Sequence, residues 1–576
     1  MRKVSIGKQD YESLIKSGCF YVDKTYFIKE WWESQDDVTL ITRPRRFGKT
    51  LNMSMLECFF SNKYAGRGDL FEGLSIWNDE KYRQLQGTYP VIFISFAEIK
   101  ANNFKDTKND MVSVINDVYK QHSYLLEDDM LTDAERNLFR QLDNYSNNTN
   151  VNKDISNETI YRAVKNLAAI LYRKFEKKVI ILLDEYDTPM QEAYVNGYWN
   201  ELVSFTRSFF NATFKSNPYM ECAVMTGITR VSKESVFSDL NNLKVITVES
   251  DEYSGVFGFS EEEVFLALDN FNLSDKKQIV KEWYDGFTFG KSKDIYNPWS
   301  IINFLDEKNY KTYWADSSSN GLINSLVKTG SSYIKMMMET LLKGETIDVP
   351  IDEQIVFSQL DYSEDAVWSL MLASGYLKVI SSDKLTGDRT KSVMYKLALT
   401  NFEIKLMFED MILRWFSPAK NETNEFIKAL ICGDIESMNA YMNKVALKTI
   451  SYFDTGNVPS DEEPERFFHG FVLGLMVDQS ENYIITSNRE SGFGRYDIML
   501  EPKDKQSQKY PGIVIEFKVI NPRKENSLEE TVEAALKQIE EKNYDAELIN
   551  RGVKEENIHH YGFAFKSKEV LIDGRY

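Results

Sequence analysis

Two stretches of the chain contain residues whose types and spacing suit phosphate chemistry. The first is RPRRFGKT, residues 43–50, which ends in Gly48, Lys49 and Thr50 as in the phosphate-binding pattern GxxxxGK[ST], whereas Arg43 replaces the first glycine. In such a loop the backbone N–H groups surround a phosphate chain, the lysine reaches the β- and γ-phosphates, and the final hydroxyl binds Mg²⁺. This stretch therefore predicts a nucleotide site, with a solvated basic turn as the alternative.

The second stretch is KVIILLDEYDTP, residues 178–189. Residues 179–183 are an unbroken apolar run, typical of a parallel strand buried on both faces, and Asp184 and Glu185 follow it directly. A magnesium ion held by Asp184 and a water oriented or deprotonated by Glu185 would give both carboxylates a partner. The alternative is an ordinary strand end with solvated acids, and the preceding phosphate loop makes it the weaker interpretation.

The loop needs a strand before it and a helix after it to bind phosphate in this way. The apolar residues 38–41 precede it, and LNMSMLECFF, with apolar residues at helical spacing, follows it. Arg46, Phe47 and Gly48 would then lie at the positive end of a helix, where backbone N–H groups face a phosphate. We expect these residues, together with the lysine and threonine after them, to bind ATP.

Three further apolar runs predict the rest of an open parallel sheet: residues 91–96, 222–226 and 245–248. Ligands of such sheets lie at the carboxyl ends of the strands. Thr226, at the end of its strand, and Thr229 nearby are therefore candidates to sense the γ-phosphate. A role as turn residues is the alternative for both.

A second set of candidate catalytic residues lies near the C-terminus. RYDIMLEP, residues 495–502, and PGIVIEFKVI, residues 511–520, have the pattern of two strands. Glu516 and Lys518 are two residues apart, so they share one face of a strand. If Asp497 lies on the neighbouring strand, the two carboxylates can hold Mg²⁺ while the lysine orients a water and stabilises charge on a phosphoryl transition state. A cross-strand ion pair is the alternative.

Predicted helices flank these C-terminal strands. An apolar helix that begins at Glu465 precedes them, an amphipathic helix over SLEETVEAALKQIEEKNY follows, and HYGFAF forms a last strand. This order resembles the PD-(D/E)XK nuclease superfamily over residues 464–567, with the three residues just described on its signature positions. The resemblance implies that Glu465 is a further metal ligand and that Gln538 and Tyr544 form the Q…Y helix motif.

The N-terminal half resembles a second family. FYVDKTYFIKEWWE, ITRPRRFGKTLNMSML, LLDEYDTPM, MTGITRVSKESVFSDLNNL, EWYDGFTFG, YNPWSIINFL and YWADSSSN together look like the AAA-ATPase-like family of bacterial proteins that often carry a PD-(D/E)XK nuclease domain. The resemblance runs from residue 1 to about residue 320 and places the loop and strand-end residues on the Walker A and Walker B positions. In this family the loop is written with arginine at its first position. We expect the Arg43 side chain to narrow the loop.

Composition limits the class of protein. The chain has 576 residues, 43% hydrophobic and 13% aromatic, a formal net charge of −19, and four cysteines that form no CxxC pair. Its N-terminal stretch shows no apolar h-region typical of a signal peptide, and its apolar runs are far shorter than the ~20 residues that span a bilayer. We therefore expect a soluble cytoplasmic protein without a membrane partner. The acidic charge argues against a basic nucleic-acid coat, yet a local basic groove can exist.

The predicted fold is α/β with four parts. Residues 1–250 form the parallel sheet of a P-loop NTPase of the AAA-like class, residues 251–340 its helical lid, residues 341–460 a helical, winged-helix-like connecting region, and residues 461–576 the nuclease-like domain. The Pro, Gly and acidic residues of YFDTGNVPSDEEP indicate a linker before the last part.

Two functions follow from these predictions. The first is an enzyme, an ATP-binding protein and ATPase coupled to a Mg²⁺-dependent nuclease that acts on nucleic acid, DNA ahead of RNA. The second is a nucleotide-gated interaction or regulatory protein whose nuclease fold is weak or inactive. Self-association and a protein partner stay open in both.

Overall fold

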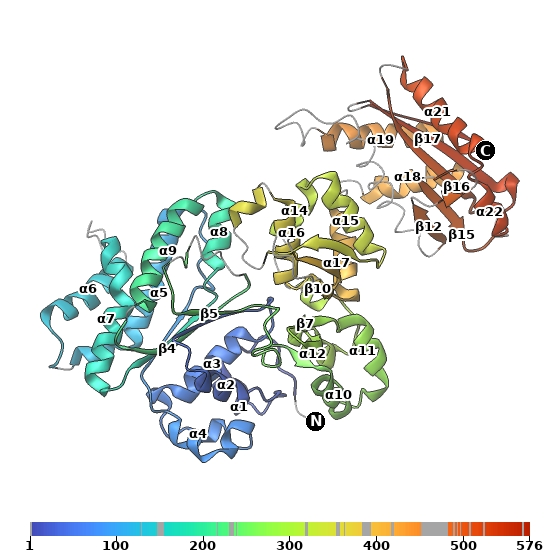
Figure 1. The fold of residues 1–576 in the computed structure, drawn as a ribbon. Helices are drawn as coiled ribbons and strands as arrows, with labels where there is room; N and C mark the ends of the chain where they lie inside the picture. The colour runs from blue at the N-terminus through green and yellow to red at the C-terminus, as the bar shows by residue number, and fades with distance from the viewer. Residues whose placement is uncertain are drawn as a thin grey trace. The chain divides into compact units, whose positions relative to one another are not determined.

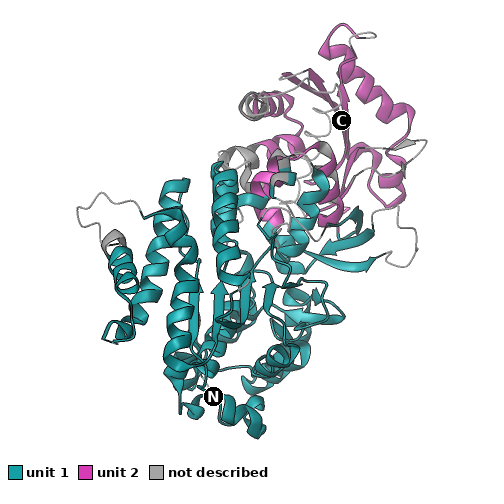
Figure 2. Ribbon diagram, turned by 60° about the vertical axis from the view of Figure 1, so that its left-hand side comes forward, with its two compact units in different colours: residues 1–323, 344–407 teal, residues 324–343, 408–576 magenta. Residues whose placement is uncertain are grey.

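The structure is a computed structural model. It describes residues 3–127, 129–146, 155–215, 217–229, 236–237, 239–316, 321–352, 357–361, 363–382, 393–415, 420–450, 482–487, 490–491, 494–495, 497–505, 509–521, 525–566 and 569–576. The chain divides into two compact units (Figures 1 and 2). The first comprises Met1–Ile323 and Gly344–Met407, and the second Asn324–Lys343 and Phe408–Tyr576.

A five-stranded parallel sheet forms the centre of the first unit (Figure 1). Its strands are β1 (Val38–Thr42), β2 (Val91–Ser95), β3 (Val179–Asp184), β4 (Met220–Gly227) and β5 (Leu243–Ile246), in the order β2-β3-β4-β1-β5. Every residue of β1 and β3 is buried, as expected for parallel strands that helices cover on both faces. In this order β4 lies between β1, which the phosphate loop follows, and β3, which ends at the two acids.

The helices of this sheet domain follow apolar periodicity and standard caps. They are α1 (Tyr11–Lys16), α2 (Tyr26–Ser34), α3 (Lys49–Phe60), α4 (Glu80–Leu85), α5 (Phe104–Gln121), α6 (Asp133–Ser146), α7 (Asn157–Phe175), α8 (Thr188–Asn196) and α9 (Trp199–Phe214). In α7, the Ser156 hydroxyl accepts a hydrogen bond from the Thr159 N–H, and Ile160, Val164, Leu167 and further residues at the same spacing are buried. Burial of such faces fixes the helices on the sheet.

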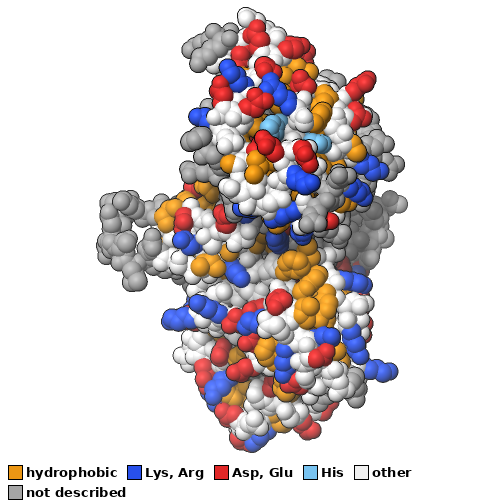
Figure 3. All heavy atoms as spheres, turned by 90° about the vertical axis from the view of Figure 1, so that its right-hand side faces the viewer, with side chains coloured by type: hydrophobic (Ala, Val, Ile, Leu, Met, Phe, Trp, Pro, Cys, Tyr) orange, Lys and Arg blue, Asp and Glu red, His pale blue; other side chains and the backbone are white. Residues whose placement is uncertain are grey.

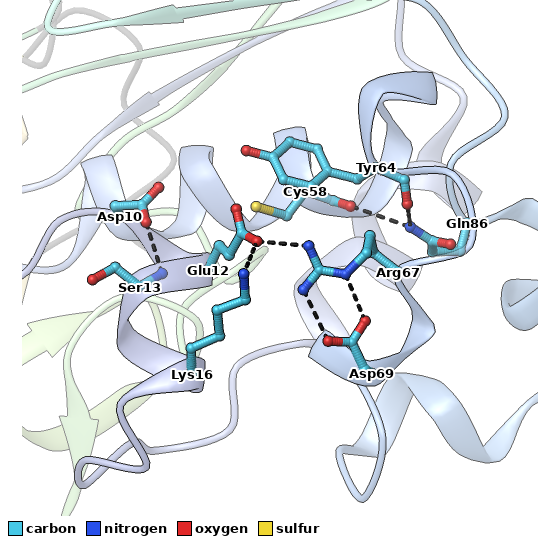
Figure 4. Close-up of polar contacts among 9 residues, drawn as sticks. All are labelled: Asp10, Glu12, Ser13, Lys16, Cys58, Tyr64, Arg67, Asp69 and Gln86. Carbon is cyan, nitrogen blue, oxygen red and sulfur yellow. Dashed lines mark hydrogen bonds and ion pairs between the residues drawn. The ribbon is translucent and has the colours of Figure 1, made fainter.

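Ion pairs on the surface hold α1 beside the segment after α3 (Figure 4). Glu12 pairs with Lys16 and with Arg67, both at 2.6 Å, and Arg67 also pairs with Asp69 at 2.8 Å. The Asp10 side chain caps the start of α1. Because exposed pairs of this kind contribute ~0–1 kcal/mol each, the apolar burial of α1 against α3 is the larger stabilising effect.

The lid follows the sheet domain. It contains β6 (Phe259–Ser260), α10 (Glu261–Asn270), α11 (Lys277–Tyr284), β7 (Phe287–Phe289), β8 (Ser292–Tyr296), α12 (Pro298–Glu307) and α13 (Tyr313–Asp316), and its small antiparallel sheet has the order β6-β8-β7. Tyr284, Tyr296 and Trp314 are almost fully buried. These aromatic residues therefore pack the lid and do not offer a surface for stacking bases.

The region predicted as helical and winged-helix-like contains a helix, two strands and a second helix. They are α16 (Glu364–Ala373), β10 (Leu377–Ser382), β11 (Met394–Leu399) and α17 (Phe402–Trp415), and β9 (Ile347–Pro350) adds a third strand in the order β10-β11-β9. Two more helices, α14 (Gly321–Thr329) and α15 (Ser332–Leu342), precede β9. This is the winged-helix-like part of the predicted fold.

A mixed five-stranded sheet forms the centre of the second unit, in the order β12-β15-β16-β17-β18. The strands are β12 (Tyr483–Ser487), β15 (Ile498–Pro502), β16 (Gly512–Val519), β17 (Ile558–Lys566) and β18 (Glu569–Arg575), and the main helices are α18 (Lys420–Cys432), α19 (Ile435–Ile450), α21 (Leu528–Glu541) and α22 (Ala546–Asn550). Strands β16 and β17 run parallel, and the other neighbours are antiparallel.

The two faces of β16 have different helical neighbours. Ile513, Ile515 and Phe517 belong to a hydrophobic cluster with α18 and α19. Val514 belongs to another cluster, with Ile539 of α21 and Leu548 of α22. Strand alternation therefore directs the polar residues of the Val514 face toward α21.

Two predictions lie outside the described residues: the helix that begins at Glu465 and the linker over 452–464. In the part of the chain that the structure describes, no helix combines the length and apolar character needed to cross a bilayer.

Candidate nucleotide and metal sites

The phosphate loop, residues 43–50, joins β1 to α3 with a left-handed turn before the helix. Gly48 precedes α3 with φ 79°, a backbone conformation that favours glycine, and Arg46 has φ 64°. Lys49 is 4% exposed, and its Nζ donates to the carbonyls of Arg43 and Pro44, both at 3.0 Å. Burial lowers the pKa of Lys49, and the carboxylates beyond the loop oppose this shift. The ammonium is thus held inside the loop.

Two hydroxyl groups converge on Asp184 at the end of β3. Thr50 Oγ1 donates to Asp184 Oδ2 at 2.7 Å, and the Thr226 hydroxyl donates to the other carboxylate oxygen. Burial raises the pKa of Asp184, and both hydroxyls oppose that shift. Because β4 lies between β1 and β3, Thr226 reaches the carboxylate from the strand between them. A carboxylate and a threonine hydroxyl are hard oxygen ligands, so this set fits Mg²⁺.

Glu185 has a left-handed backbone conformation with φ 52°, which costs a residue with a side chain roughly 1–2 kcal/mol. Its N–H donates to Thr226 Oγ1 at 3.4 Å, and its carboxylate accepts from Thr188 Oγ1 at 3.2 Å. The turn therefore points the Glu185 side chain in a different direction from that of the buried Asp184.

Asp187 is a further residue of this site that the sequence did not single out. Its carboxylate, 1% exposed, accepts from the N–H groups of Ile228 and Thr229, both at 2.9 Å, and from Thr229 Oγ1 at 3.0 Å. Burial raises the pKa of Asp187, and these backbone donors lower it. Asp187 thus fixes the segment after β4. Thr229, a predicted γ-phosphate sensor, is hydrogen-bonded to Asp187. In the sequence, the signal for this residue was its place as the third acid of the DEYD stretch, residues 184–187.

The expectation that Arg43 narrows the loop is wrong. Its side chain is fully buried, and Nη1 donates to the carbonyls of Thr42 at 2.9 Å and Thr247 at 2.6 Å. The guanidinium also lies over the ring of Phe289, 4.6 Å from its centroid. Burial lowers the pKa of Arg43 to about 9. The side chain leaves the loop and anchors its first residue to the segment after β5.

The side chains of Arg46 and Phe47 contact the lid. Arg46 lies over the ring of Trp299 at 4.2 Å, and the Phe47 ring packs edge-on against Phe287 and Phe289, with centroids 4.8 and 5.3 Å away. Any contact of these two loop residues with a nucleotide would therefore involve their backbone N–H groups.

In the second unit, strand register brings two predicted metal ligands together. Ile498 pairs with Ile515 in an antiparallel ladder, so Asp497, one residue earlier, lies opposite Glu516. Asp497 Oδ2 accepts from the N–H of Phe517 at 2.8 Å, and Glu516 is 4% exposed. Asp497 directly precedes β15 and Glu516 lies on the adjacent strand β16, so the two residues are neighbours, as a shared ion requires.

Gln538 of α21 joins the acid and the lysine of this site. Its Nε2 donates to Glu516 Oε1, and its Oε1 accepts from Lys518 Nζ at 2.7 Å. Gln538 Nε2 also lies 3.2 Å from the Tyr544 hydroxyl. Burial raises the pKa of Tyr544, as do the nearby charges of Glu516 and Asp497. Two carboxylates form an oxygen donor set that fits Mg²⁺.

Another acidic group lies in the lid. Oxygen atoms of Glu261, Asp285 and Asp294 lie within 4.8 Å of one another, and Lys281 pairs with all three. Burial and the neighbouring Asp294 raise the pKa of Asp285 to about 7. Because the Lys281 ammonium offsets part of this charge and the raised pKa of Asp285 favours its neutral form, we assign the group to the packing of the lid.

Parts of the chain are similar to known proteins. Residues 5–237 match the family model described as predicted AAA-ATPase, and residues 463–574 match that of the PD-(D/E)XK nuclease superfamily. An uncharacterized protein from the vnfD 5′ region of Azotobacter chroococcum mcd 1 is 23% identical over 443 residues, 76% of each chain. The solved ORC2 protein of Aeropyrum pernix, in ADPNP-ADP complexes, is 9% identical, with 71% of this chain and 95% of that chain covered and a TM-score of 0.22.

The fold and the matched models define a P-loop protein with a second, nuclease-type domain. The chain carries an AAA-ATPase-like domain followed by a domain of the PD-(D/E)XK nuclease superfamily, which confirms both predicted resemblances and the predicted fold class.

Proposed function

We propose that the protein binds and hydrolyses ATP with Mg²⁺ at the phosphate loop and uses this cycle to control a Mg²⁺-dependent nuclease in its second unit. The nuclease site would be Asp497, Glu516 and Lys518. The observation that supports it best is the arrangement in which Gln538 contacts both Glu516 and Lys518, while Asp497 lies opposite Glu516. A buried acid and a lysine held on one face of a strand suit metal-assisted phosphodiester cleavage.

In the ATPase, each residue would act on a different part of the reaction. Lys49 would bind the β- and γ-phosphates, Glu185 would orient or deprotonate the attacking water, and Thr226 would donate to the γ-phosphate. Thr50 and Asp184 would hold Mg²⁺, which supplies charge neutralisation along the phosphates when bound.

In the nuclease, Lys518 would orient the attacking water and stabilise the negative charge that develops on the phosphoryl oxygens. Gln538 would hold the Lys518 ammonium in position. Asp497 and Glu516 would bind Mg²⁺, which supplies a Lewis acid at the scissile phosphate. Glu465 remains a proposed further ligand.

The proposed substrate is nucleic acid, DNA ahead of RNA. The net charge of −19 supports the alternative of a nucleotide-gated regulatory protein with a weak or inactive nuclease fold. On the face shown in Figure 3, acidic and basic side chains are interspersed, so they form no patch of a single charge sign there. All four cysteines are free thiols, which supports a reducing cytoplasm.

Two substitutions in the full-length protein test the proposal. Lys49→Ala should abolish ATP binding because it removes the main cation for the phosphates, and Asp497→Asn should abolish Mg²⁺-dependent cleavage of labelled DNA and RNA while ATP affinity stays unchanged. Lys63→Ala and Asp504→Asn, both at exposed positions, are the matched controls. Unchanged nucleotide affinity in Lys49→Ala would refute the ATP site, and full cleavage by Asp497→Asn would refute Asp497 as a ligand of the nuclease metal. Absence of cleavage by the wild type would favour the regulatory alternative.

A further inference from the structure

One backbone carbonyl of the phosphate loop accepts hydrogen bonds from two lid side chains. The Arg45 oxygen accepts from Trp314 Nε1 at 2.9 Å and from Asn297 Nδ2 at 3.3 Å. Both donor residues are 1% exposed. Asn297 also caps α12, because its Oδ1 accepts from the N–H of Trp299 at 2.8 Å. The ends of α12 and α13 therefore meet at this carbonyl.

A buried carboxylate of α17 holds these lid elements. Glu403 is 1% exposed; its Oε1 accepts from the backbone N–H of Trp314 at 2.6 Å, and its Oε2 accepts from Ser300 Oγ at 2.8 Å. A carboxylate at this depth is costly unless it is hydrogen-bonded. Glu403 thus couples the position of α17 to those of α12 and α13.

The position of the Arg45 carbonyl matters because a peptide group is planar. The Arg45 C=O and the Arg46 N–H lie in one plane and point in opposite directions, so donors that fix the oxygen toward the lid also direct the Arg46 N–H away from it. Arg46 has φ 64°, and Lys49 already bonds to the two carbonyls before Arg45. The lid therefore sets the orientation of the Arg46 N–H, the first of the loop N–H groups that would face a bound phosphate.

We propose that Trp314 and Glu403 are positioning residues of the nucleotide site, and that α17 carries the nucleotide state of the loop to the second unit. Helix α17, Phe402–Trp415, begins in the first unit and continues into the second after Met407. Any shift of the loop on binding phosphate would move the Arg45 carbonyl, then Trp314, then Glu403. This inference rests on the proposed ATP binding and adds its route of regulation.

The first experiment measures the affinity of a fluorescent ATP analogue with Mg²⁺ in full-length variants. Trp314→Phe removes the indole N–H and keeps a ring, so binding should weaken about fivefold, the effect of roughly one net hydrogen bond. Trp77→Phe makes the same change in a tryptophan of the sheet domain that stacks on Phe71, and should bind as the wild type does.

A second pair of variants tests Glu403. In Glu403→Gln the amide can accept from the Trp314 N–H and donate to the Ser300 hydroxyl, so it should bind nucleotide as the wild type does. Glu403→Leu keeps the volume and removes both acceptors, so binding should weaken more than in Trp314→Phe. Unfolding midpoints identify variants that merely fail to fold.

Hydrogen exchange gives a readout that a purely structural role would not change. Saturating ATP should slow exchange of the α17 amides in the wild type and in Trp77→Phe, and should leave α17 unchanged in Trp314→Phe. If the wild type binds ATP and Trp314→Phe matches it in affinity and in α17 exchange, this inference is wrong while the proposed function stands. If the wild type binds no ATP, both fail.

Discussion

Asp184 and Glu185 are adjacent carboxylates in different environments, which allows them separate tasks. Asp184 lies at the end of the buried strand with a hydroxyl donor on each oxygen. Glu185 turns away in the left-handed region and accepts a hydrogen bond from Thr188. The first environment suits a metal ligand and the second a group that handles water.

Glu185→Gln should therefore keep ATP binding and lower hydrolysis about 100-fold or more, because the amide preserves shape but cannot take a proton. Nucleotide binding and phosphate release, measured on the same preparation, check this. Glu201→Gln changes an exposed glutamate and should hydrolyse ATP at the wild-type rate. Hydrolysis at the original rate in Glu185→Gln would show that another residue activates the water.

In the second unit, Lys518→Ala should separate metal binding from chemistry. The lysine contacts Gln538 and is not a metal ligand, so Mn²⁺ affinity should stay near that of the wild type while single-turnover cleavage slows about 100-fold. Glu516→Gln should instead weaken Mn²⁺ binding. Equal loss of metal affinity in both variants would contradict the separate roles.

The elements that sequence patterns predicted best are those with strong local signals. Four of the five parallel strands match predicted apolar runs, whereas β5, Leu243–Ile246, begins two residues before the predicted run 245–248. The two-residue spacing of Glu516 and Lys518 correctly placed both on one face of β16. The short strands β6 and β7 have two or three residues, too few to show a period. The strand β9 was also missed.

Contacts between distant segments could not be predicted in this way. The course of the Arg43 side chain depends on the Thr247 carbonyl and the Phe289 ring, and the bond between Trp314 and Glu403 joins residues 89 positions apart. Neither partner shows a local pattern that points to the other. The anchoring role of Asp187 likewise depends on where β4 ends.

Between α11 and β7 lies Asp285, a carboxyl group that should make the stability of the fold depend on pH. Asp285 has its pKa raised to about 7 by burial and by Asp294, although Lys281 and Lys378 lie near. A folded-state pKa above the unfolded value means that protonation favours folding. The contribution is therefore complete below the unfolded pKa and is lost as the pH rises through about 7.

Asp285→Asn should remove this dependence. Its unfolding midpoint should exceed that of the wild type by more at about pH 8.5 than at about pH 6, because only the wild type ionises between those values. Asp275→Asn, which changes an exposed acid of the same lid, should follow the wild-type pH profile. A constant difference across this pH range would contradict the assigned titration.

At the scale of the whole molecule, the proposal requires that the two units influence each other. DNA should stimulate phosphate release by the wild type, and Asp497→Asn, which should still bind DNA, should retain that stimulation. Lys49→Ala should lose any ATP dependence of cleavage while its metal site stays intact. Phosphate release that is identical with and without DNA would instead favour the regulatory protein.

The packing of α18 and α19 has a consequence for how such proteins can exchange parts in evolution. Phe426, Leu430, Met438 and Met442 of these helices share one hydrophobic cluster with Ile513 and other sheet residues. A recombination point just before the matched nuclease segment would leave these helices with a foreign sheet and mismatched side chains. Gene fusions that bring in a new nuclease should therefore have their junction upstream of α18, so the heritable module is longer than the segment recognised as nuclease.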